Sequence, residues 1–411
     1  MADCDLLVIG AGAAGLAAGI TAARAGKRVL LLESAPEPGR KILLTGGGRC
    51  NLSNAALGAR APRFADYYGA AGAFVRPALG ACPLAAVLGF FQSLGLETTA
   101  PDDVHYYPRS EKAADVRDAL ALALAAAGGE TVTGFTVKKL APDGNGWLAA
   151  DADGRTFSGE KCLLATGGVS PRALAADAWT PALDTGHALT PARPALAPLT
   201  VDDFPCAALS GISVPAELRL GGGKKAPRAA GDLLFTHTGI SGPAVLDISA
   251  DAADAVRTDA RAEITVDFVP AVPDWAGEFS AWRREGGKKT VLSLLKTRLP
   301  EALGRTLLEL SGTAPDRRAA ELTAKESAAL AQNLAARKMS VTRLDGFHKA
   351  MVTRGGVALK EVNPHTLESR KAPGLYFAGE ILDVDGRCGG FNLHWAWASG
   401  ILAARSAARA D

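Results

Sequence analysis

The first thirty-three residues constrain this chain most strongly, because they combine an apolar strand, a glycine-rich turn and a small-residue helix. The apolar run Leu6 to Ile9 has the length of a buried parallel strand, and it ends at Gly10-Ala11-Gly12-Ala13-Ala14-Gly15. In such a unit the first glycine permits the turn, the second lets the backbone approach a pyrophosphate, and the third lets helix and strand pack closely. The N–H groups and positive dipole end of the helix then face the phosphates.

A second apolar run, Val29 to Leu32, ends at Glu33, where a carboxylate can hydrogen-bond a ribose hydroxyl. Strand, turn, helix, second strand and acid therefore occur in order within one unit. We predict that this unit binds the adenosine half of a dinucleotide. The motif alone does not separate FAD from NAD(P).

Length and composition describe a multidomain globular protein. At 411 residues the chain exceeds what one core usually organises, so we expect two or three domains. The net charge of +2 gives no overall attraction to nucleic acid or to a membrane. The acidic start and the glycines within residues 6–20 argue against a targeting or spanning segment, so we expect a cytoplasmic protein. Six cysteines without a C-x-x-C spacing argue against a zinc site and a disulfide framework, and we expect no metal.

A glycine-rich loop follows Glu33 directly. It contains Ser34, then Arg40 and Lys41, and then Thr45-Gly46-Gly47-Gly48-Arg49-Cys50-Asn51. Three successive glycines expose N–H groups that can line an anion or a flat ring, and the cations lie beside them. The loop therefore predicts a continuation of the cofactor site, and the alternative is a flexible loop with solvated charges.

The next segment is predicted to be mostly helical, with helices at Pro83 to Leu94 and at Ser110 to Ala127, the second capped by Ser110. Residues 106–109 form a loop before that helix, which either reaches toward a cofactor or covers the core. Further on, an apolar strand ends at Ala165-Thr166-Gly167-Gly168 and repeats the pattern of the opening strand.

From about Pro191 the pattern changes to short alternating segments with proline, which predict an antiparallel β domain. Residues from about 271 to 337 are again mostly helical. We therefore predict a domain inserted at 191–345, β first and helical later, between two parts of one domain at 1–190 and 346–411. Two basic runs, Lys224-Lys225 and Arg283 to Lys289, are expected to be solvated faces.

The C-terminal segment returns to the opening pattern. A strand ends at Gly379-Glu380, and Asp385-Gly386 then leads to Gly389-Gly390-Phe391-Asn392-Leu393, which opens a helix through Ala408. A nicotinamide dehydrogenase does not require this arrangement, whereas a bound flavin does. Glu380 would approach the ribityl chain or pyrophosphate, and the helix would direct N–H groups at the pyrimidine edge of the isoalloxazine, favouring the anionic reduced flavin.

Five motifs resemble those of the BaiN/YhiN-type family of FAD-dependent oxidoreductases. They lie at residues 45–51, 164–168, 234–244, 353–357 and 374–386. The resemblance implies an α/β fold in which a discontinuous, Rossmann-like FAD-binding domain is interrupted by a β-barrel-like insert with a helical addition. It also implies non-covalent FAD. The candidate FAD-binding residues are those already named at 10–15, 33–34, 40–41, 45–51, 165–167, 379–380, 385–386 and 389–393.

Two segments differ from many family members. After Gly168, many members have a Tyr-Pro and then a Gly-Asp-Gly stretch, whereas this chain has Val169-Ser170-Pro171-Arg172 and then Asp184 to His187. The second difference is His394, at a position where Gln is common. Both differences lie where contacts with substrate or flavin are expected.

We therefore predict an FAD-dependent reductase that passes hydride from NAD(P)H, a transient visitor, to an activated carbon–carbon double bond. Cys50 is the first candidate proton donor, with Arg49 tuning its pKa, and its alternative role is packing beneath the isoalloxazine. His237 is a second catalytic candidate, and its alternative is a local hydrogen bond.

The family suggests two acceptors. Some members reduce a uridine of 23S ribosomal RNA to dihydrouridine, and another is linked to bile-acid ring reduction. The basic runs fit ribosomal RNA or a precursor ribosomal particle as partner, and the near-neutral charge fits a small-molecule enone. A non-catalytic flavin sensor or ribosome-assembly factor is the remaining alternative.

Overall fold

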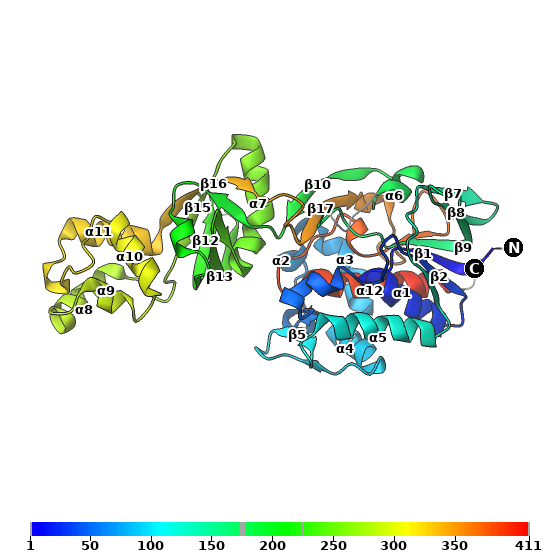
Figure 1. Ribbon diagram of the computed structural model, residues 1–411, viewed down its shortest axis with the longest axis horizontal. Helices are drawn as coiled ribbons and strands as arrows, with labels where there is room; N and C mark the ends of the chain where they lie inside the picture. The colour runs from blue at the N-terminus through cyan, green and yellow to red at the C-terminus, as the bar shows by residue number, and fades with distance from the viewer. Residues whose placement is uncertain (1, 172–177, 224–225, 410–411) are drawn as a thin grey trace. The chain divides into compact units, whose positions relative to one another are not determined.

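The computed structural model describes residues 2–171, 178–223 and 226–409. The chain divides into two compact units (Figure 1): unit 1 comprises residues 1–193 and 351–411, and unit 2 comprises residues 194–350. Unit 1 is therefore assembled from two segments that are far apart in sequence, and unit 2 from one continuous segment.

A seven-stranded sheet forms the centre of unit 1, in the order β6-β2-β1-β9-β8-β7, with β18 also paired to β9. Its parallel strands are β1 (Cys4–Ile9), β2 (Val29–Leu32), β6 (Glu130–Val132), β9 (Thr156–Leu164) and β18 (Leu375–Phe377). The hairpin of β7 (Lys139–Asp143) and β8 (Gly146–Ala150) adds to β9 in antiparallel fashion. Because parallel strands align their carboxyl ends, the segments that follow β1, β2, β9 and β18 meet at one edge.

Two helices from opposite ends of the sequence pack against this sheet. α1 (Ala13–Arg24) and α12 (Phe391–Ala407) lie side by side, with α5 (Ala113–Ala126) next to α1 (Figure 1). A Cβ added at Gly400 of α12 would lie 2.3 Å from the carbonyl oxygen of Ala14. This glycine therefore permits the close approach of the two helices.

The remaining elements of unit 1 are short. They are the helices α2 (Ala65–Tyr68), α3 (Gly72–Ala81), α4 (Leu84–Ser93) and α6 (Thr180–Asp184), the strands β3 (Ser53–Asn54), β4 (Thr98–Thr99), β5 (His105–Pro108), β10 (Leu189–Ala195) and β17 (Val352–Val357), and the 3-10 turns η1 (Ile42–Gly48), η2 (Ala55–Gly58), η3 (Gly69–Ala71), η7 (Leu359–Glu361) and η8 (Gly379–Ile381).

Two local predictions were wrong. Residues 106–108 belong to β5, which pairs with β3 and β4, so this segment is a strand and not a loop that reaches toward a cofactor. Ser110 does not cap α5, because that helix begins at Ala113 and its N-cap, Lys112, makes no side-chain cap bond.

Unit 2 contains a closed barrel in the order β11-β14-β13-β12-β15-β16. The strands are β11 (Leu199–Val201), β12 (Ser213–Leu220), β13 (Arg228–Thr236), β14 (Gly239–Ser241), β15 (Ala262–Asp267) and β16 (Arg337–Leu344). Side chains of β12 alternate between exposed and buried, as expected for a barrel filled on its inner side. The rings of Phe204, Phe235 and Phe268 pack together within its core.

Helices complete unit 2. α7 (Pro243–Asp259) contacts the barrel strands, and α8 (Trp275–Gly286), α9 (Val291–Leu295), α10 (Glu301–Leu310) and α11 (Ala324–Ala335) follow between β15 and β16, with η5 (Cys206–Leu209) and η6 (Ala319–Glu321) as 3-10 turns. A reciprocal capping box between Thr323 and Glu326 starts α11. The predicted fold class, an α/β domain with a β-barrel-like insert and a helical addition, is confirmed.

Within the part of the chain that the structure describes, no helix by itself combines the length and the apolar composition needed to cross a membrane. The segment Ala65–Ala81 and the helix Leu84–Ser93 meet those criteria only as a pair, which is bent by 49°. Among the same described residues, no group of three or more His, Cys, Asp or Glu side chains is placed to hold a metal ion.

Candidate functional site

A cavity of unit 1 lies at the carboxyl edge of the parallel sheet. Segments that follow β1, β2, β9 and β18 all contribute to its wall. The predicted cofactor residues that line it are Gly10, Gly12, Ala13, Ala14, Glu33, Ser34, Arg40, Lys41, Thr45, Ala165, Thr166, Gly167, Gly379, Glu380, Asn392 and Leu393. The predicted residues outside the wall are Ala11, Gly15, Gly46, Gly47, Gly48, Arg49, Cys50, Asn51, Asp385, Gly386, Gly389, Gly390 and Phe391.

The three glycines of the opening turn differ in their surroundings. Gly10 has a φ of +101°, and a Cβ there would lie 2.5 Å from the carbonyl oxygen of Ala165. A Cβ at Gly15 would lie 1.9 Å from the carbonyl oxygen of Gly10, so helix and strand approach closely at this point. A Cβ at Gly12 would meet no atom within 4 Å. The backbone at Gly12 is therefore open to the cavity, and no side chain caps α1, which begins there.

The Glu33 carboxylate is fixed at the end of β2. One of its oxygens accepts a hydrogen bond from the Ala11 N–H at 2.8 Å, and the other accepts from the Ala35 N–H at 2.8 Å and from the Ser34 hydroxyl at 3.3 Å. Because a carboxylate has about four acceptor positions, it retains capacity for one more donor, such as a ribose hydroxyl. The Phe135 to Val137 segment lines the cavity beside it.

Three distant segments meet at Glu380. Its carboxylate forms an ion pair with Lys41, which is 339 positions earlier in sequence, and it accepts a hydrogen bond from the Thr353 N–H at 2.8 Å. A Cβ at Gly379 would lie 2.9 Å from the Cβ of Ala14, in the first turn of α1. The C-terminal strand end and the N-terminal turn are therefore neighbours in one wall.

The triple-glycine loop turns away from the cavity. Gly46, Gly47 and Gly48 all have positive φ, and the Arg49 guanidinium lies 4.5 Å from the centre of the Tyr107 ring and 3.3 Å from the Glu111 carboxylate. Arg49 is thus a structural cation between this loop and β5, not a cation of the cavity wall.

Cys50 is also outside the wall. Its side chain is 0% exposed, and burial raises the pKa of the thiol to about 12, with a hydrogen bond to Thr45 acting in the opposite direction. Arg49 does not tune this pKa. The geometry therefore favours packing, the alternative considered for Cys50, over proton donation.

The first turn of α12 supplies another part of the wall. Its N-cap is Gly390, with a φ of +96° and no side-chain cap, and Asn392 and Leu393 line the cavity. A Cβ at Gly390 would lie 2.6 Å from the carbonyl oxygen of Ser53. With its amide suitably oriented, Asn51 accepts from the Gly390 N–H at 3.2 Å, so Asn51 positions this helix start from outside the cavity.

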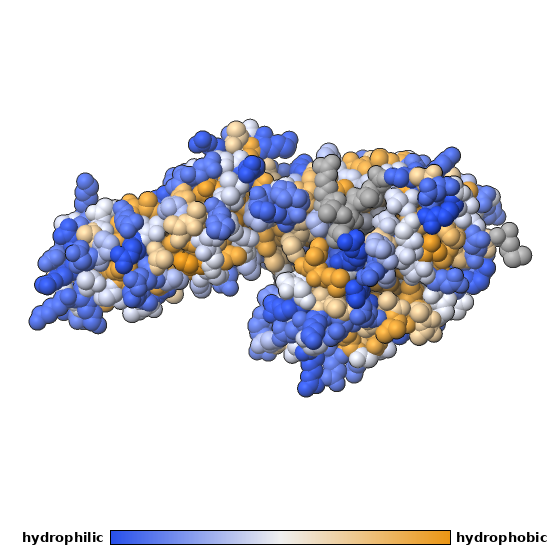
Figure 2. Space-filling view, in the orientation of Figure 1, coloured by the Kyte–Doolittle hydropathy of each residue, from blue (hydrophilic) through white to orange (hydrophobic). Residues whose placement is uncertain are grey.

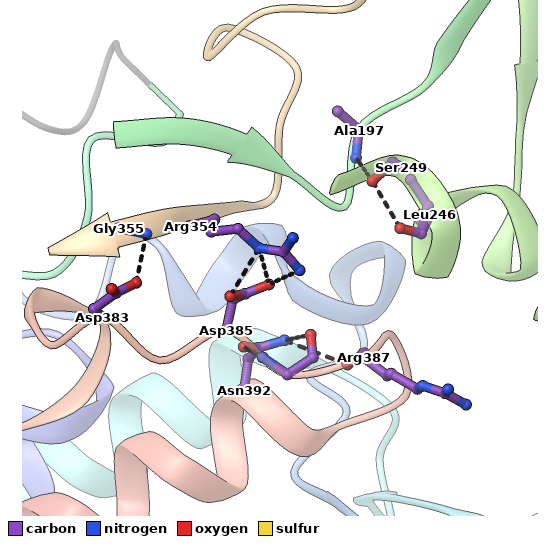
Figure 3. A network of polar contacts seen from close by, with 10 residues as sticks. Ala197, Leu246, Ser249, Arg354, Gly355, Asp383, Asp385, Arg387 and Asn392 are labelled. Atoms are coloured by element: carbon purple, nitrogen blue, oxygen red, sulfur yellow. Dashed lines mark hydrogen bonds and ion pairs between the residues drawn. The ribbon is translucent and has the colours of Figure 1, made fainter. Parts of the chain in front are cut away.

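A polar network holds the segment that leads into α12 (Figure 3). The Arg354 Nε lies 3.1 Å from both carboxylate oxygens of Asp385, and Asp383 accepts from the Gly355 N–H at 3.0 Å. The Asn392 side chain accepts from the Gly386 N–H and donates to the Gly386 carbonyl, both at 2.8 Å. Asp385 and Gly386 therefore support the wall without lining it.

The two histidines in the segments that differ from many family members, His394 and His187, are buried and hydrogen-bonded within the protein. His394 is 0% exposed and outside the cavity wall, with Nδ1 2.7 Å from the Ser53 hydroxyl and Nε2 3.1 Å from the Cys82 carbonyl. Nε2 donates to the carbonyl, so Nδ1 accepts from Ser53, and burial lowers the pKa of this imidazole to about 4. His187 is also buried and bonds Thr185 and Ser369. Both histidines therefore lie outside the cavity wall, and Arg172 lies outside the described residues.

His237 belongs to unit 2, in the turn between β13 and β14, where it is exposed. The Lys224-Lys225 run lies outside the described residues. In the other basic run, Arg283 donates to the Leu322 carbonyl and the Ser327 hydroxyl, so it holds the helical part together.

Several wall residues were not predicted. They are Ile9, Leu32, Ala35, Gly39, Ile42, Phe135, Thr136, Val137, Gly168, Ser170, Ala178, Pro181, Met351, Val352, Ala378, Val384, Trp395 and Ala396. Most are apolar and carry no motif, so the sequence offered no signal for them. The unusual Val169-Ser170-Pro171 stretch was the only signal for Ser170.

The family model for the HI0933-like protein Rossmann domain matches residues 4–406. The chain belongs to the HI0933-like family. It is 36% identical over 408 residues to a 3-dehydro-bile acid delta(4,6)-reductase of Clostridium scindens, covering 98% of each chain. It is 31% identical over 407 residues to a ribosomal RNA dihydrouridine synthase of Escherichia coli, covering 96% of each.

A solved structure, a 3-ketosteroid-delta4-(5alpha)-dehydrogenase from Rhodococcus jostii, matches with a TM-score of 0.50 at 18% identity, covering 100% of this chain and 98% of that one. At this identity the likeness shows the fold alone. As a member of the HI0933-like family, the protein is an FAD-dependent oxidoreductase with a Rossmann-like FAD-binding domain, and the predicted family, the enzyme class and FAD as the cofactor are confirmed.

Proposed function

We propose that this HI0933-like protein is a reductase that uses NAD(P)H and FAD to add hydride to a carbon–carbon double bond conjugated to a carbonyl. The observation that carries the proposal is the meeting of the Gly10–Gly15 turn and the Gly379-Glu380 segment in one wall. Among the described residues, unit 1 has one dinucleotide turn of this kind, so NAD(P)H would visit the site transiently.

The wall residues fit FAD. The open backbone at Gly12, the uncapped start of α1 and the exposed Arg40 side chain suit a pyrophosphate, and Glu33 suits the adenosine ribose. When bound, FAD supplies the hydride transfer from the pyridine nucleotide to the acceptor.

The other residues orient the cofactor and shape its electrostatic surroundings. Lys41 and Glu380 would position the ribityl chain, since both line the cavity where the two segments of unit 1 meet. The start of α12 places partial positive charge at the part of the wall lined by Asn392 and Leu393, where it would stabilise negative charge on the pyrimidine edge of the flavin.

The acceptor we propose first is a uridine of 23S ribosomal RNA, which contains the required conjugated double bond. Relatives named ribosomal RNA dihydrouridine synthase, at 31% and 30% identity over almost the whole chain, support it. Action on ribosomal RNA would also agree with a cytoplasmic protein.

A small-molecule enone is the second candidate, and specific observations favour it. The relative named for a bile-acid reductase is 36% identical. Acidic and basic residues are nearly equal in number in unit 2, so the unit as a whole has no strong positive charge, although hydrophilic residues are visible over its helical part (Figure 2). One of the two basic runs also contains a structural arginine, Arg283.

Two measurements test the proposal. Purified protein mixed anaerobically with NADH or NADPH should lose its flavin absorbance, and protein that binds no FAD, or FAD that neither nucleotide reduces, would contradict the reductase. Deleting the gene should then remove one dihydrouridine from 23S ribosomal RNA. Unchanged RNA, together with turnover of a steroid-like enone, would replace the first acceptor with the second.

A further inference from the structure

One residue of the cavity wall, Ser170, has a buried hydroxyl without a hydrogen-bond partner among the described residues. The Ser170 side chain is 2% exposed, and its oxygen bonds no other group among the described residues. In the described part of unit 1 the only other buried side-chain polar atom without a hydrogen-bond partner is the Trp179 indole nitrogen, and Trp179 does not line the cavity. Buried polar groups nearly always have a partner, so an orphan in a cavity wall indicates a group that a ligand completes.

The other buried serines of unit 1 do have partners. Ser53 bonds His394, Ser369 accepts from the N–H groups of Lys371 and Ala372, and Ser399 accepts from the Gly379 N–H. The fold therefore satisfies buried hydroxyls elsewhere in this unit. Among the described residues of unit 1, Ser170 is the buried serine that lines the cavity, and it is also the one left without a partner.

The backbone holds Ser170 firmly at this place. The preceding Val169 N–H donates to the Thr353 hydroxyl at 2.9 Å. A Cβ at Gly168 would lie 2.7 Å from a Glu380 oxygen, so the segment packs directly against the Glu380 carboxylate. The orphan hydroxyl is thus two residues from the point where the Lys41–Glu380 pair and β17 meet.

We propose that the Ser170 hydroxyl is a binding group for FAD and hydrogen-bonds a polar atom of the cofactor. The inference rests on FAD occupying this cavity. The inference predicts that removing the hydroxyl affects the FAD complex but not the apo-protein. The apo-protein loses nothing, because the hydroxyl bonds nothing there, whereas the FAD complex loses one hydrogen bond.

The test compares Ser170→Ala, Ser170→Thr and the control Ser369→Ala. FAD affinity is measured by titrating FAD into the full-length apo-protein, and the melting temperature of each apo-protein is recorded. We expect Ser170→Ala to weaken FAD binding about tenfold without lowering the apo-protein melting temperature. Ser170→Thr, which keeps a hydroxyl, should restore most of the affinity.

The control has the reverse profile. Ser369→Ala removes a hydroxyl that is already bonded, so it should lower the apo-protein melting temperature and change FAD affinity by less than about twofold. Equal FAD affinity in Ser170→Ala and wild type would overturn the inference. A Ser170→Ala variant in which only the KM for the acceptor rises, while FAD affinity is unchanged, would also overturn it. Wild-type protein that binds no FAD would instead contradict the proposed function, so the two failures are distinguishable.

Discussion

Removing the Lys41–Glu380 ion pair should weaken the junction between the two sequence segments of unit 1. The pair is half-buried, with side chains 32% and 19% exposed. Exposed pairs contribute about 0.2–1 kcal/mol, and breaking a fully buried one costs about 3–5 kcal/mol. We therefore expect a coupling energy of about 1–2 kcal/mol in the apo-protein. Glu380→Gln is a suitable partner variant because the amide oxygen still accepts from the Thr353 N–H.

The assay is a double-mutant cycle of Lys41→Met and Glu380→Gln, with unfolding in urea. Replacing Trp275 and Trp282 with Phe leaves tryptophans only in unit 1, so fluorescence then reports on that unit.

The matched control is Arg109–Glu97, an exposed ion pair of the same unit with side chains 76% and 70% exposed, for which we expect less than about 0.5 kcal/mol. A Lys41–Glu380 coupling no larger than that of the control would refute the reasoning, because the junction would then not depend on this contact.

Three further predictions concern single residues. Gly12→Ala should leave apo-protein stability nearly unchanged but abolish FAD binding, because the added Cβ meets no protein atom and faces the cavity. Gly15→Ala should prevent folding, because its Cβ would overlap the Gly10 carbonyl. If thermal melts and FAD titrations showed the same effects for the two variants, this prediction would be contradicted. The pKa of His394 is about 4 in the folded state, lower than its usual 6.5. Between these two pH values the unfolded chain therefore binds more protons than the folded protein. The free energy of unfolding should fall as the pH drops from 6.5 toward 4, by up to about 1.4 kcal/mol per pH unit. In urea unfolding at several pH values, His394→Gln should show a smaller loss, and an unchanged slope would refute the assignment. Cys50→Ala should retain FAD and at least half of the turnover rate, and a hundredfold loss would instead make Cys50 the proton donor.

The parts of the site that depend on local chain geometry could be predicted from the sequence. Gly10, Gly12 and Gly15 are required by one tight turn, and Gly379-Glu380 follows a strand whose apolar residues are contiguous in sequence. At each of these positions, residues only a few places away in sequence determine the local backbone conformation. The parallel sheet then brings the strand ends to a common edge, because the carboxyl ends of parallel strands align.

The direction of loops and the composition of the wall could not be predicted. Arg49 and Cys50 are close to lining residues in sequence, but the positive φ values of Gly46, Gly47, Gly48 and Cys50 turn the chain toward β5. Phe135 and Met351 line the cavity through packing between distant segments, which no local pattern reports. His394 faces the core, and not the ligand, because its place on α12 turns it toward Ser53 and the Cys82 carbonyl.

The central claim is that strand ends from both sequence segments of unit 1 hold a single FAD. A crystal structure of the protein with FAD tests it most directly. We expect one FAD per chain, with its pyrophosphate against Gly12 and its isoalloxazine at the start of α12. A flavin that contacts the N-terminal turn but leaves Glu380 and α12 untouched would contradict the account.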